Sequence, residues 1–501
     1  MNHYLTIGNN RTIPLKTIPV LKYEDFLELN IGLIRNETNH CVNYFGFYYK
    51  HKLKLICCVA NDSNASILIS SAEINQGTAH DYPSFTARHL SFHLFERVLH
   101  ENFGIAYSDH PWLKPVRYSF NRTNKNDQIE NYPFYQIKSE ELHEVGVGPI
   151  HAGIIEPGHF RFICNGEQIL HLEIQLGYQH RGVEQLFLSK PKLLQRTVLA
   201  ESIAGDTVAG HTTAFVNLWE SLCGYTATQD IQFARTVALE LERIAIHTGD
   251  LSAICTDIGY QLGSAVFGRL RTPIINFFQE WCGNRLAKGL IRAGINRFHF
   301  SNKLATRLEE LFHEYEADFD EIWKEFHTLP SVMARLEKTG VITRDLAASI
   351  GTVGMAARAT GLMRDVRTTH PHDLYNLFSP ISIIKHHGDV YSRAKIRYNE
   401  IVQSLFYLRK IIRKIPSEVN VREPLLPPGA DNFGITLTEG WRGEICHCAI
   451  TDEKGELFQY KIKDPSMHNW LAVAMAVRNN EISDFPISNK SFGLSYCGHD
   501  L

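Results

Sequence analysis

A central segment, AESIAGDTVAGHT at 200–212, combines small residues with polar side chains that could take part in chemistry. It lies between two apolar stretches and contains one aspartate, two glycines, several hydroxyl groups and His211. A second polar segment, DPSMHN, lies at 464–469. Carboxylates and imidazoles can transfer protons, but neither segment contains the thiolates that bind soft metal ions.

The cysteines indicate packing and not metal binding. The chain has 10 cysteines, and none forms a C-x-x-C pair, whereas zinc and iron–sulfur sites usually use two such pairs. The nearest clusters are Cys57–Cys58 in KLICCVA and Cys446–His447–Cys448 in EICHCAI. Both stretches are predicted strands, where adjacent side chains point to opposite faces and so cannot easily share a metal.

The bulk composition is that of an ordinary globular protein. The 501 residues are long enough for two or three domains, and 44% of them are hydrophobic and 21% charged. A net charge of −3 gives no field that would favour nucleic acid. The sequence has no apolar run long enough to span a membrane and no signal-peptide pattern. We therefore expect a cytoplasmic location and reduced thiols.

The first part of the chain, residues 1–135, is predicted to be a mixed α/β domain. Short β-branched runs at 53–60 and 65–74 are typical of strands, and 84–104 is predicted as an amphipathic helix ending at a glycine. The polar stretch 122–134 is a predicted linker. The following hairpin, with its turn at 165–167, opens a second domain that covers 136–501.

The period of the apolar residues becomes helical between about 190 and 415. Helices are predicted over 230–270, 303–326 and 386–415, with a segment rich in small residues at 345–367. After Pro416 the sequence predicts a hairpin around 452–455 and a helix at 469–478. The expected fold class is therefore α+β: an N-terminal α/β domain followed by β-hairpins and a central helical bundle.

Several motifs resemble one protein family. EPGHFRFICNGE, GYQHRGVEQLF, ALELERIAIHTGDL, RATGLMRDVR and YKIKDPSMHNW are similar to the large subunit of energy-converting (group 4) nickel–iron hydrogenases, which is also the forty-nine-kilodalton-type subunit of respiratory complex I. ERVLHENFGIAYSDHPWL resembles the family's thirty-kilodalton-type subunit, and some members fuse the two modules in this order. The resemblance implies a thirty-kilodalton-like domain at 1–135 and a hydrogenase-large-subunit-like domain at 136–501.

The resemblance also implies that four metal-binding cysteines of the family's hydrogenases are replaced in this chain. In the hydrogenases, four cysteine thiolates hold nickel and iron, and alignment of the motifs places Ala204, Thr207, Ser466 and Asn469 at those positions. Alanine has no donor atom, and serine and asparagine are hard, weak ligands for low-valent nickel. We expect no nickel–iron centre and no other cofactor in this chain. The resemblance is closest to hydrogenase-related members that lack these cysteines.

In the complex I branch, which also lacks the cysteines, the vacated cavity takes a quinone headgroup. The family uses a histidine in the first hairpin and a tyrosine on the following helix. Here the alignment places Glu156 or Pro157 near the histidine position, with His159 close by, and Leu199 at the tyrosine position. Glu156 and His159 are the quinone-site candidates, although neither headgroup partner is carried over unchanged.

Five polar residues match motif positions beside the former metal pocket: Glu184, Glu201, His211, Arg358 and Asp464. Buried carboxylates next to a cavity should have raised pKa values and could relay protons. The alternative is a buried network, with Glu184 and Arg358 paired, that only specifies the fold. His180–Arg181, Glu242–Arg243 and His247 are assigned to structure or to contacts with other subunits.

The resemblance implies a subunit of a membrane-associated, ion-translocating redox complex. Its expected partners are a small iron–sulfur subunit, a membrane anchor and antiporter-like membrane subunits, which would place it peripherally on the cytoplasmic side of the inner membrane. Three roles stay open: a redox or proton-coupling cavity, a non-catalytic scaffold, or quinone reduction. Whether the chain itself is an enzyme is left undecided. We expect the 200–212 segment and the DPSMHN loop to meet in space.

Overall fold

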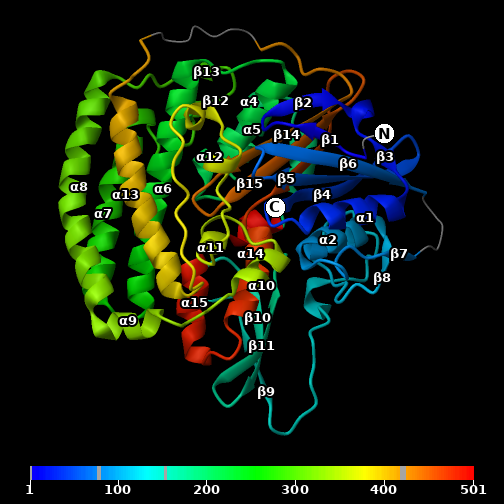
Figure 1. The fold of residues 1–501 in the computed structure, drawn as a ribbon, viewed down its shortest axis with the longest axis horizontal. Helices are drawn as coiled ribbons and strands as arrows, with labels where there is room; N and C mark the ends of the chain where they lie inside the picture. The colour runs from blue at the N-terminus through cyan, green and yellow to red at the C-terminus, as the bar shows by residue number, and fades with distance from the viewer. Residues whose placement is uncertain (1–2, 76–80, 152–154, 418–424) are drawn as a thin grey trace.

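The computed structural model describes residues 3–75, 81–151, 155–417 and 425–501. Figure 1 shows an N-terminal α/β region beside a bundle of long helices, with C-terminal segments between them. The chain is thus a mixed helix-and-sheet protein, as the sequence predicts. Within the described residues, no helix is both long and apolar enough to cross a membrane.

The N-terminal region is built on a five-stranded sheet. Its strands follow the order β1 (Leu5–Ile7), β6 (Ser66–Ile74), β5 (Lys52–Asn61) and β4 (Asn39–Tyr49), and β3 (Val20–Leu21) pairs with β6. Helices α1 (Tyr23–Ile34) and α2 (His93–Phe103) cover one face. A short parallel pair, β7 (Asp81–Pro83) and β8 (Ala106–Ser108), lies beside them.

Both faces of this sheet are buried, and the side chains of β5 alternate between them. Leu55, Cys57 and Val59 pack toward α1 and α2, whereas Ile56 and Cys58 pack on the C-terminal sheet. This alternation follows the period of two in a strand and places the adjacent thiols of Cys57 and Cys58 on opposite faces. The predicted strands at 53–60 and 65–74 are confirmed.

The C-terminal sheet recruits a strand from the other end of the chain. Its order is β16 (Leu457–Lys463), β15 (Glu444–Thr451), β14 (Asn432–Glu439) and β2 (Arg11–Pro14), all antiparallel. The hairpin expected around 452–455 joins β15 to β16, and a second turn at 440–443 joins β14 to β15. That second turn contains Arg442, which contributes to the candidate site.

Long helices form the other half of the molecule (Figure 1). Helix α5 (Val208–Leu222) packs against β14 and β15, and α6 (Gln229–Asp257), α7 (Gln261–Cys282), α8 (Asn302–Thr328) and α13 (Val390–Ile412) pack on one another. The predicted helix at 230–270 is two helices, because Gly259 adopts a left-handed φ of 74° and reverses the chain. The predictions at 303–326 and 386–415 are confirmed.

Short elements complete the fold. The helices are α3 (Val183–Ser189), α4 (Leu193–Ala200), α9 (Pro330–Leu336), α10 (Arg344–Ile350), α11 (Gly354–Arg358), α12 (Val366–Thr369), α14 (Ser466–Ala476), α15 (Phe485–Phe492) and α16 (Tyr496–Asp500). A small pair joins β12 (Ile291–Arg292) to β13 (Ile295–Asn296), and 3-10 turns cover Leu15–Thr17, Leu90–Phe92, Ile129–Asn131, Asp373–Asn376 and Ile482–Asp484.

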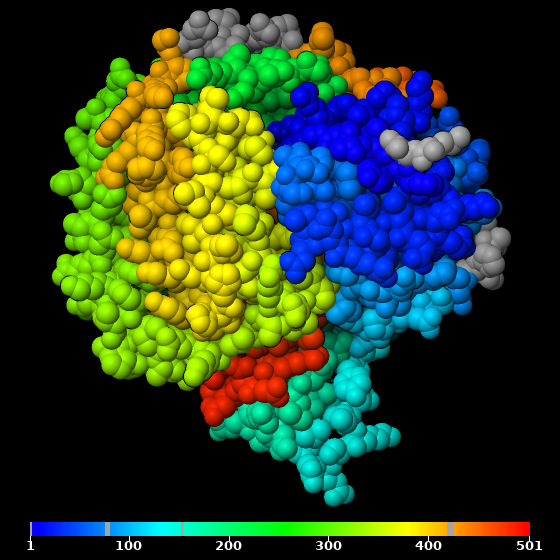
Figure 2. Space-filling view, viewed as in Figure 1, coloured from blue at the N-terminus to red at the C-terminus, as the bar shows by residue number. Residues whose placement is uncertain are grey.

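A third sheet extends from one end of the molecule, where Figure 2 shows the cyan-to-teal part of the chain protruding. It consists of β11 (Gln168–Gln175), β10 (His159–Asn165) and β9 (His143–Val147). The predicted hairpin with its turn at 165–167 is confirmed as β10 and β11. The sequence analysis did not predict β9.

The predicted helix at 84–104 is wrong in its first half. Helix α2 begins only at His93, after a 3-10 turn, and ends at Gly104 as expected. The buried carboxylate of Glu96 accepts hydrogen bonds from the backbone N–H of Phe85 and from the N–H and hydroxyl of Thr86. These bonds hold the preceding segment as a loop folded back onto the helix.

Candidate functional site

The four positions that would carry thiolates are all buried. Helix α4 ends at Ala200, a turn follows, and Thr207 directly precedes α5. Ala204 lies in that turn, and Ser466 and Asn469 lie in the first turn of α14. The exposed fraction of each of these four residues is 0% or 1%. Solvent therefore has no direct access to any of them.

Arg442, in the turn between β14 and β15, fills the space beside the first pair. Its guanidinium donates to both carboxylate oxygens of Asp206 at 2.6 Å and to the hydroxyl of Thr207 at 2.9 Å. The group also lies 4.0 Å from the centre of the Trp441 ring. A bidentate ion pair between arginine and a carboxylate, with the guanidinium stacked on an aromatic ring, is among the stronger interactions that arginine makes.

The second pair is held by backbone groups. The hydroxyl of Ser466 accepts from the N–H of Ser495 at 3.0 Å. The side-chain amide of Asn469 exchanges two hydrogen bonds with the backbone of Val353, at 3.1 and 3.2 Å. The next residue, Gly354, lies so close to the Arg442 backbone that an added Cβ would come within 2.2 Å of the Arg442 carbonyl oxygen. The turn that carries Arg442 thus contacts Asp206 and Thr207 directly, and it also packs on Gly354, the neighbour of the Val353 that binds Asn469.

Behind this turn lies a chain of hydrogen-bonded titratable groups, all of them buried. The Tyr460 hydroxyl is 2.7 Å from His447 Nδ1, and His447 Nε2 is 3.1 Å from His211 Nδ1. His211 Nε2 is 2.9 Å from the carboxylate of Asp464. Helix α16 closes over that carboxylate, because a Cβ on Gly498 would lie 2.7 Å from Asp464 Cγ. We call Tyr460, His447, His211 and Asp464 the histidine chain.

Burial and neighbouring charges set the protonation states of the groups in the histidine chain. Burial raises the pKa of Asp464, but the hydrogen bond to His211 and the charge of Arg442 outweigh it and lower the pKa to about 2. Burial lowers the pKa of His447 well below its usual value and raises that of the Tyr460 phenol well above. At neutral pH, Asp464 is therefore ionised, His447 is neutral and Tyr460 keeps its proton.

Glu184 and Glu201 do not join the histidine chain. The Glu184 carboxylate pairs with Lys461 at 2.7 Å and accepts from the N–H of Ile462 at 3.1 Å. Burial raises its pKa, but the charge of Lys461 outweighs this and lowers the value overall. Glu201 accepts from the N–H of Gly289 at 2.8 Å and pairs with Arg292. The raised pKa expected for buried carboxylates here is wrong for Glu184 and Asp464, because both have cationic or hydrogen-bonding partners.

Arg358 belongs to a separate buried network and does not pair with Glu184. Its guanidinium contacts Glu400 and donates to Glu439 at 2.8 Å and to the carbonyl oxygen of Arg364 at 2.7 Å. Arg243, Arg367, Glu240, Asp365 and His247 complete this network, which we call the ionic core. The three arginines lower the pKa of Glu400 well below its usual value, whereas burial raises that of Glu439.

Glu242 is the residue whose chemistry the sequence did not reveal. It accepts from the backbone N–H groups of Ala209 (2.7 Å) and Gly210 (3.1 Å), in the first turn of α5. Burial, with the nearby charge of Asp206, raises its pKa to about 8. From its sequence position, Glu242 was expected to serve structure or contacts with other subunits. Only its place in the ALELERIAIHTGDL motif could have drawn attention to it.

The residues assigned to structure do make such contacts. Arg181 donates to the carbonyl oxygens of Ser202 (2.6 Å) and Ile203 (2.9 Å), which fixes the turn that contains Ala204. His180 is hydrogen-bonded to the backbone of Asp500 at 2.8 Å. His247 contacts Glu400 at 2.8 Å, and burial lowers its pKa to about 4.

The two quinone-site candidates face different neighbours. The carboxylate of Glu156 accepts from the N–H of Cys497, in α16, at 3.4 Å. His159 instead contacts the carbonyl oxygen of Gly148 at 3.0 Å, with its ring 5.2 Å from that of Phe134. The structure therefore does not bring the two side chains together on one pocket. Leu199 lies on α4, next to the turn that contains Ala204.

The residues present do not fit a nickel–iron group. A methyl group, two hydroxyls and an amide replace the four thiolates, and the three polar ones are engaged by Arg442, Ser495 and Val353. Among the described residues, no cluster of three or more His, Cys, Asp or Glu side chains has an arrangement that could hold a metal ion. What the site contains instead is a set of ordered proton donors and acceptors.

Comparisons with known proteins identify relatives of this chain. Residues 257–432 match the family model "Respiratory-chain NADH dehydrogenase, 49 Kd subunit". Hydrogenase-4 component G of Escherichia coli is 27% identical over 382 residues, which are 75% of this chain and 65% of that protein. The alpha subunit of the membrane-bound hydrogenase of Pyrococcus furiosus is 27% identical over 367 residues, 70% of this chain and 86% of that protein. This chain is a relative of these subunits.

The relationship extends to a fused protein of complex I. The C/D fusion protein of NADH-quinone oxidoreductase from Phocaeicola vulgatus is 26% identical over 432 residues, which are 78% of this chain and 81% of that protein. The chain is thus related both to hydrogenase subunits and to complex I subunits, as its motifs predict. It spans just under two thirds of the length of the Escherichia coli hydrogenase-4 component.

Proposed function

We propose that this chain is a subunit of a membrane-associated, ion-translocating redox complex related to group 4 hydrogenases and complex I, and that it couples protons without a nickel–iron centre. The histidine chain is the observation that carries this proposal, because it is a continuous row of titratable groups beside the former metal positions. The N-terminal residues 1–135 would form the thirty-kilodalton-like module of the fusion.

The histidine chain is a continuous row of groups that can exchange protons. Ionised Asp464 can only accept, so His211 donates to it from Nε2. The other ring nitrogen of His211 faces His447 Nε2, and His447 Nδ1 faces the Tyr460 hydroxyl. An imidazole can take up a proton on one nitrogen and release one from the other, so this row supports transfer of a proton between Tyr460 and Asp464.

Glu242 would supply a second group for proton exchange near the same place. Its pKa of about 8 keeps it protonated at neutral pH, and it lies against the first turn of α5, next to His211. A carboxyl group with a pKa near the working pH can both release and take up a proton. The proposed coupling thus involves Glu242 and the histidine chain.

The proposed partners are a small iron–sulfur subunit, a membrane anchor and antiporter-like membrane subunits. Peripheral attachment at the cytoplasmic side of the membrane would follow from this assembly. The names of the relatives support membership of a redox assembly of this kind. Because Glu156 and His159 diverge, the proposal places no quinone step on this chain.

A second candidate function is that of a non-catalytic scaffold, which joins the iron–sulfur subunit to the membrane module. The position of Arg442 favours it: this side chain takes the space beside Thr207 that a metal or substrate would need. In that case the histidine chain would serve only to hold α5 against β15 and β16.

The experiment that separates the two uses the complex purified from membranes through a tag on this chain. Nickel content is measured by elemental analysis. Hydrogen oxidation is measured with a viologen dye, and ion translocation is measured in proteoliposomes. We expect no stoichiometric nickel and no hydrogen oxidation; finding either would overturn the proposal.

The decisive variants are His211→Gln and His447→Gln, since glutamine keeps polarity but cannot pass a proton on. Proton coupling predicts an assembled complex whose ion translocation falls by at least about tenfold. The control is His313→Gln, on the exposed face of α8, which should leave translocation unchanged. Unchanged translocation in all three variants would support the scaffold.

A further inference from the structure

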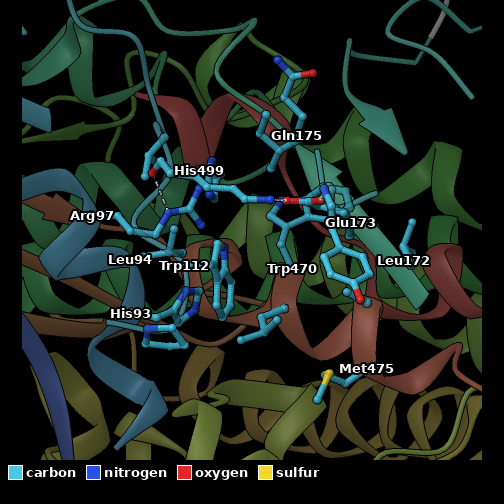
Figure 3. A pocket seen from close by; sticks show the side chains of 18 of the residues that line it. His93, Leu94, Arg97, Trp112, Leu172, Glu173, Gln175, Trp470, Met475 and His499 are labelled. Atoms are coloured by element: carbon cyan, nitrogen blue, oxygen red, sulfur yellow. Dashed lines mark hydrogen bonds and ion pairs between the residues drawn. The ribbon is translucent and has the colours of Figure 1, made fainter. Parts of the chain in front are cut away.

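A cavity of about 360 Å³ lies between the N-terminal region and the C-terminal helices (Figure 3). Its walls come from α2, the segment 111–116, β11, α14 and α16, and none of the four former ligand positions lines it. The volume is in the range of small-molecule sites. We call this space the seam cavity.

The walls are mostly apolar and aromatic. Trp112 and Trp470 provide large flat surfaces, and Leu94, Met467 and Met475 also line the cavity. In Figure 3, His93 and Leu94 of α2 lie on one side of the cavity, and Leu172 and Met475 lie on the other. Such a lining suits a flat ring, since tryptophan faces stack on aromatic groups and methionine side chains adapt to their shape.

Two of the three cationic side chains that line the cavity, Arg97 and Arg478, have no carboxylate partner among the described residues. Buried Arg97 donates to the carbonyl oxygens of Lys114 and Pro115, each at 2.8 Å, and forms no ion pair within the described part of the chain. Arg478 is exposed just beyond the end of α14, and its guanidinium contacts the ring of His171 at 3.4 Å. The single carboxylate in the wall, Glu173, is already paired with Lys114. An anionic ligand would supply the missing charge.

His93 is an unsatisfied polar group in the same wall. Its exposed fraction is 2%, and neither ring nitrogen has a hydrogen-bond partner in the part of the chain that the structure describes. Its ring stacks on Trp112, with a centroid distance of 5.1 Å. Burial and nearby positive charges lower its pKa far below the usual value, so the ring is neutral and can both donate and accept. Buried groups of this kind normally have a partner, such as a bound molecule or water.

We propose that the seam cavity binds a small aromatic acid, with its ring between Trp112 and Trp470 and its anionic group toward the arginines. Arg97 and Arg478 would attract the negative charge, and His93 would hydrogen-bond a polar edge of the ring system. Because the walls come from segments far apart in the chain, a bound molecule would also fasten the N-terminal region to α14.

The test uses 8-anilinonaphthalene-1-sulfonate, an aromatic anion whose fluorescence rises in apolar sites, added to the full-length chain and to the purified complex. We expect one saturable site per chain and a thermal transition that rises with probe concentration. Ala474→Phe fills the cavity from α14 and should weaken binding by at least about tenfold, which corresponds to roughly 1.4 kcal/mol. No saturable site would overturn the proposal.

Ala293→Phe is the matched control. It makes the same substitution in another cavity, of about 410 Å³, beside Trp219, and should leave the affinity unchanged. If Ala293→Phe removes binding, or Ala474→Phe in a folded chain does not, the probe occupies a different place and the proposal is wrong.

Arg478→Gln tests the charge at an exposed position where folding is not at risk. We expect severalfold weaker binding of the sulfonate and no change for N-phenyl-1-naphthylamine, which has the same rings without the anion. The neutral compound should also bind the unsubstituted chain about tenfold more weakly than the sulfonate. Equal affinities for the two compounds would overturn the assignment of an acidic ligand.

Discussion

The former metal site and the seam cavity differ in whether their buried polar groups have partners within the protein. Around Ala204 and Thr207, Arg442 meets the carboxylate of Asp206 and the Thr207 hydroxyl. In the seam cavity, Arg97 forms no carboxylate pair within the described residues, and His93 has no hydrogen-bond partner. The first region is closed by the protein's own charges, whereas the second leaves charge and hydrogen-bonding capacity unused.

The region that the resemblance marks as a metal site is therefore a different region from the one that has space for a ligand. The positions that the resemblance predicts for metal ligands are packed, and the cavity that could take a small molecule lies elsewhere. In the packed region a lost partner leaves a buried charge, while in the open region a polar group can be removed at little cost. The predictions below test that contrast.

The largest effect is expected in the ionic core, which lies behind the former metal site. Arg358→Met removes the buried ion-pair partner of Glu439 and one of the three arginines that pair with Glu400, and it should lower the free energy of unfolding by about 3–5 kcal/mol. Arg307→Met, in a surface pair with Glu280, is the control and should cost at most about 1 kcal/mol. Urea unfolding of both variants gives the comparison; equal losses would contradict it.

The next effect depends on pH. The folded chain keeps a proton on Glu242 up to pH 8, whereas the unfolded chain loses it near pH 4.5, so stability falls as pH rises between these values. The slope is about 1.4 kcal/mol per pH unit. Glu242→Gln removes this term, and its stability relative to the unsubstituted chain should therefore rise from pH 5 to pH 8. Parallel pH curves in urea unfolding would show that Glu242 is ionised.

A smaller pH effect of opposite sign is expected from Asp464. Its folded pKa of about 2 lies below the ordinary value of 3.8, so its contribution is present above pH 4 and is lost as pH falls to 2. The contribution is about 2 kcal/mol. Asp464→Asn should flatten this acid limb in thermal unfolding, and the exposed control Asp25→Asn should not. An unchanged acid limb in Asp464→Asn would mean that His211 does not stabilise the carboxylate.

The smallest effect is expected in the seam cavity. His93→Phe keeps the stacking on Trp112 and removes two nitrogens that have no partners, so stability should change by less than about 1 kcal/mol or increase. Thermal unfolding measures this directly. A loss above about 2 kcal/mol, the size expected when a buried hydrogen bond is broken, would mean that His93 is engaged in the folded chain. The contrast between the two regions would then fail.

Local patterns in the sequence predicted the regular elements well where one period dominates. The alternation at 53–60 became β5, and the apolar stripe with outer charges at 303–326 became α8. Prediction failed where a distant or special group intervened. Glu96 holds the 84–92 segment out of the helix, and Gly259 divides the predicted helix at 230–270.

The candidate site could be predicted only in outline. The missing thiolates at Ala204, Thr207, Ser466 and Asn469, and the presence of His211 and Asp464, are visible in the sequence once the motifs are aligned. The link from His211 to His447 spans 236 positions, and the ion pair of Arg442 with Asp206 spans the same number. Neither spacing has a local signature.

The sequence by itself determined the division into an α/β region, hairpins and long helices, and the relationship to hydrogenase and complex I subunits, because each depends on residue type and short-range period. It also determined that Ala204, Thr207, Ser466 and Asn469 carry no thiolate. Tertiary structure alone decided that Arg442 packs beside Thr207, that Glu242 holds a proton while Glu184 does not, and that a cavity opens at the seam. The physical reason is that pKa values and cavities depend on which distant groups are buried together.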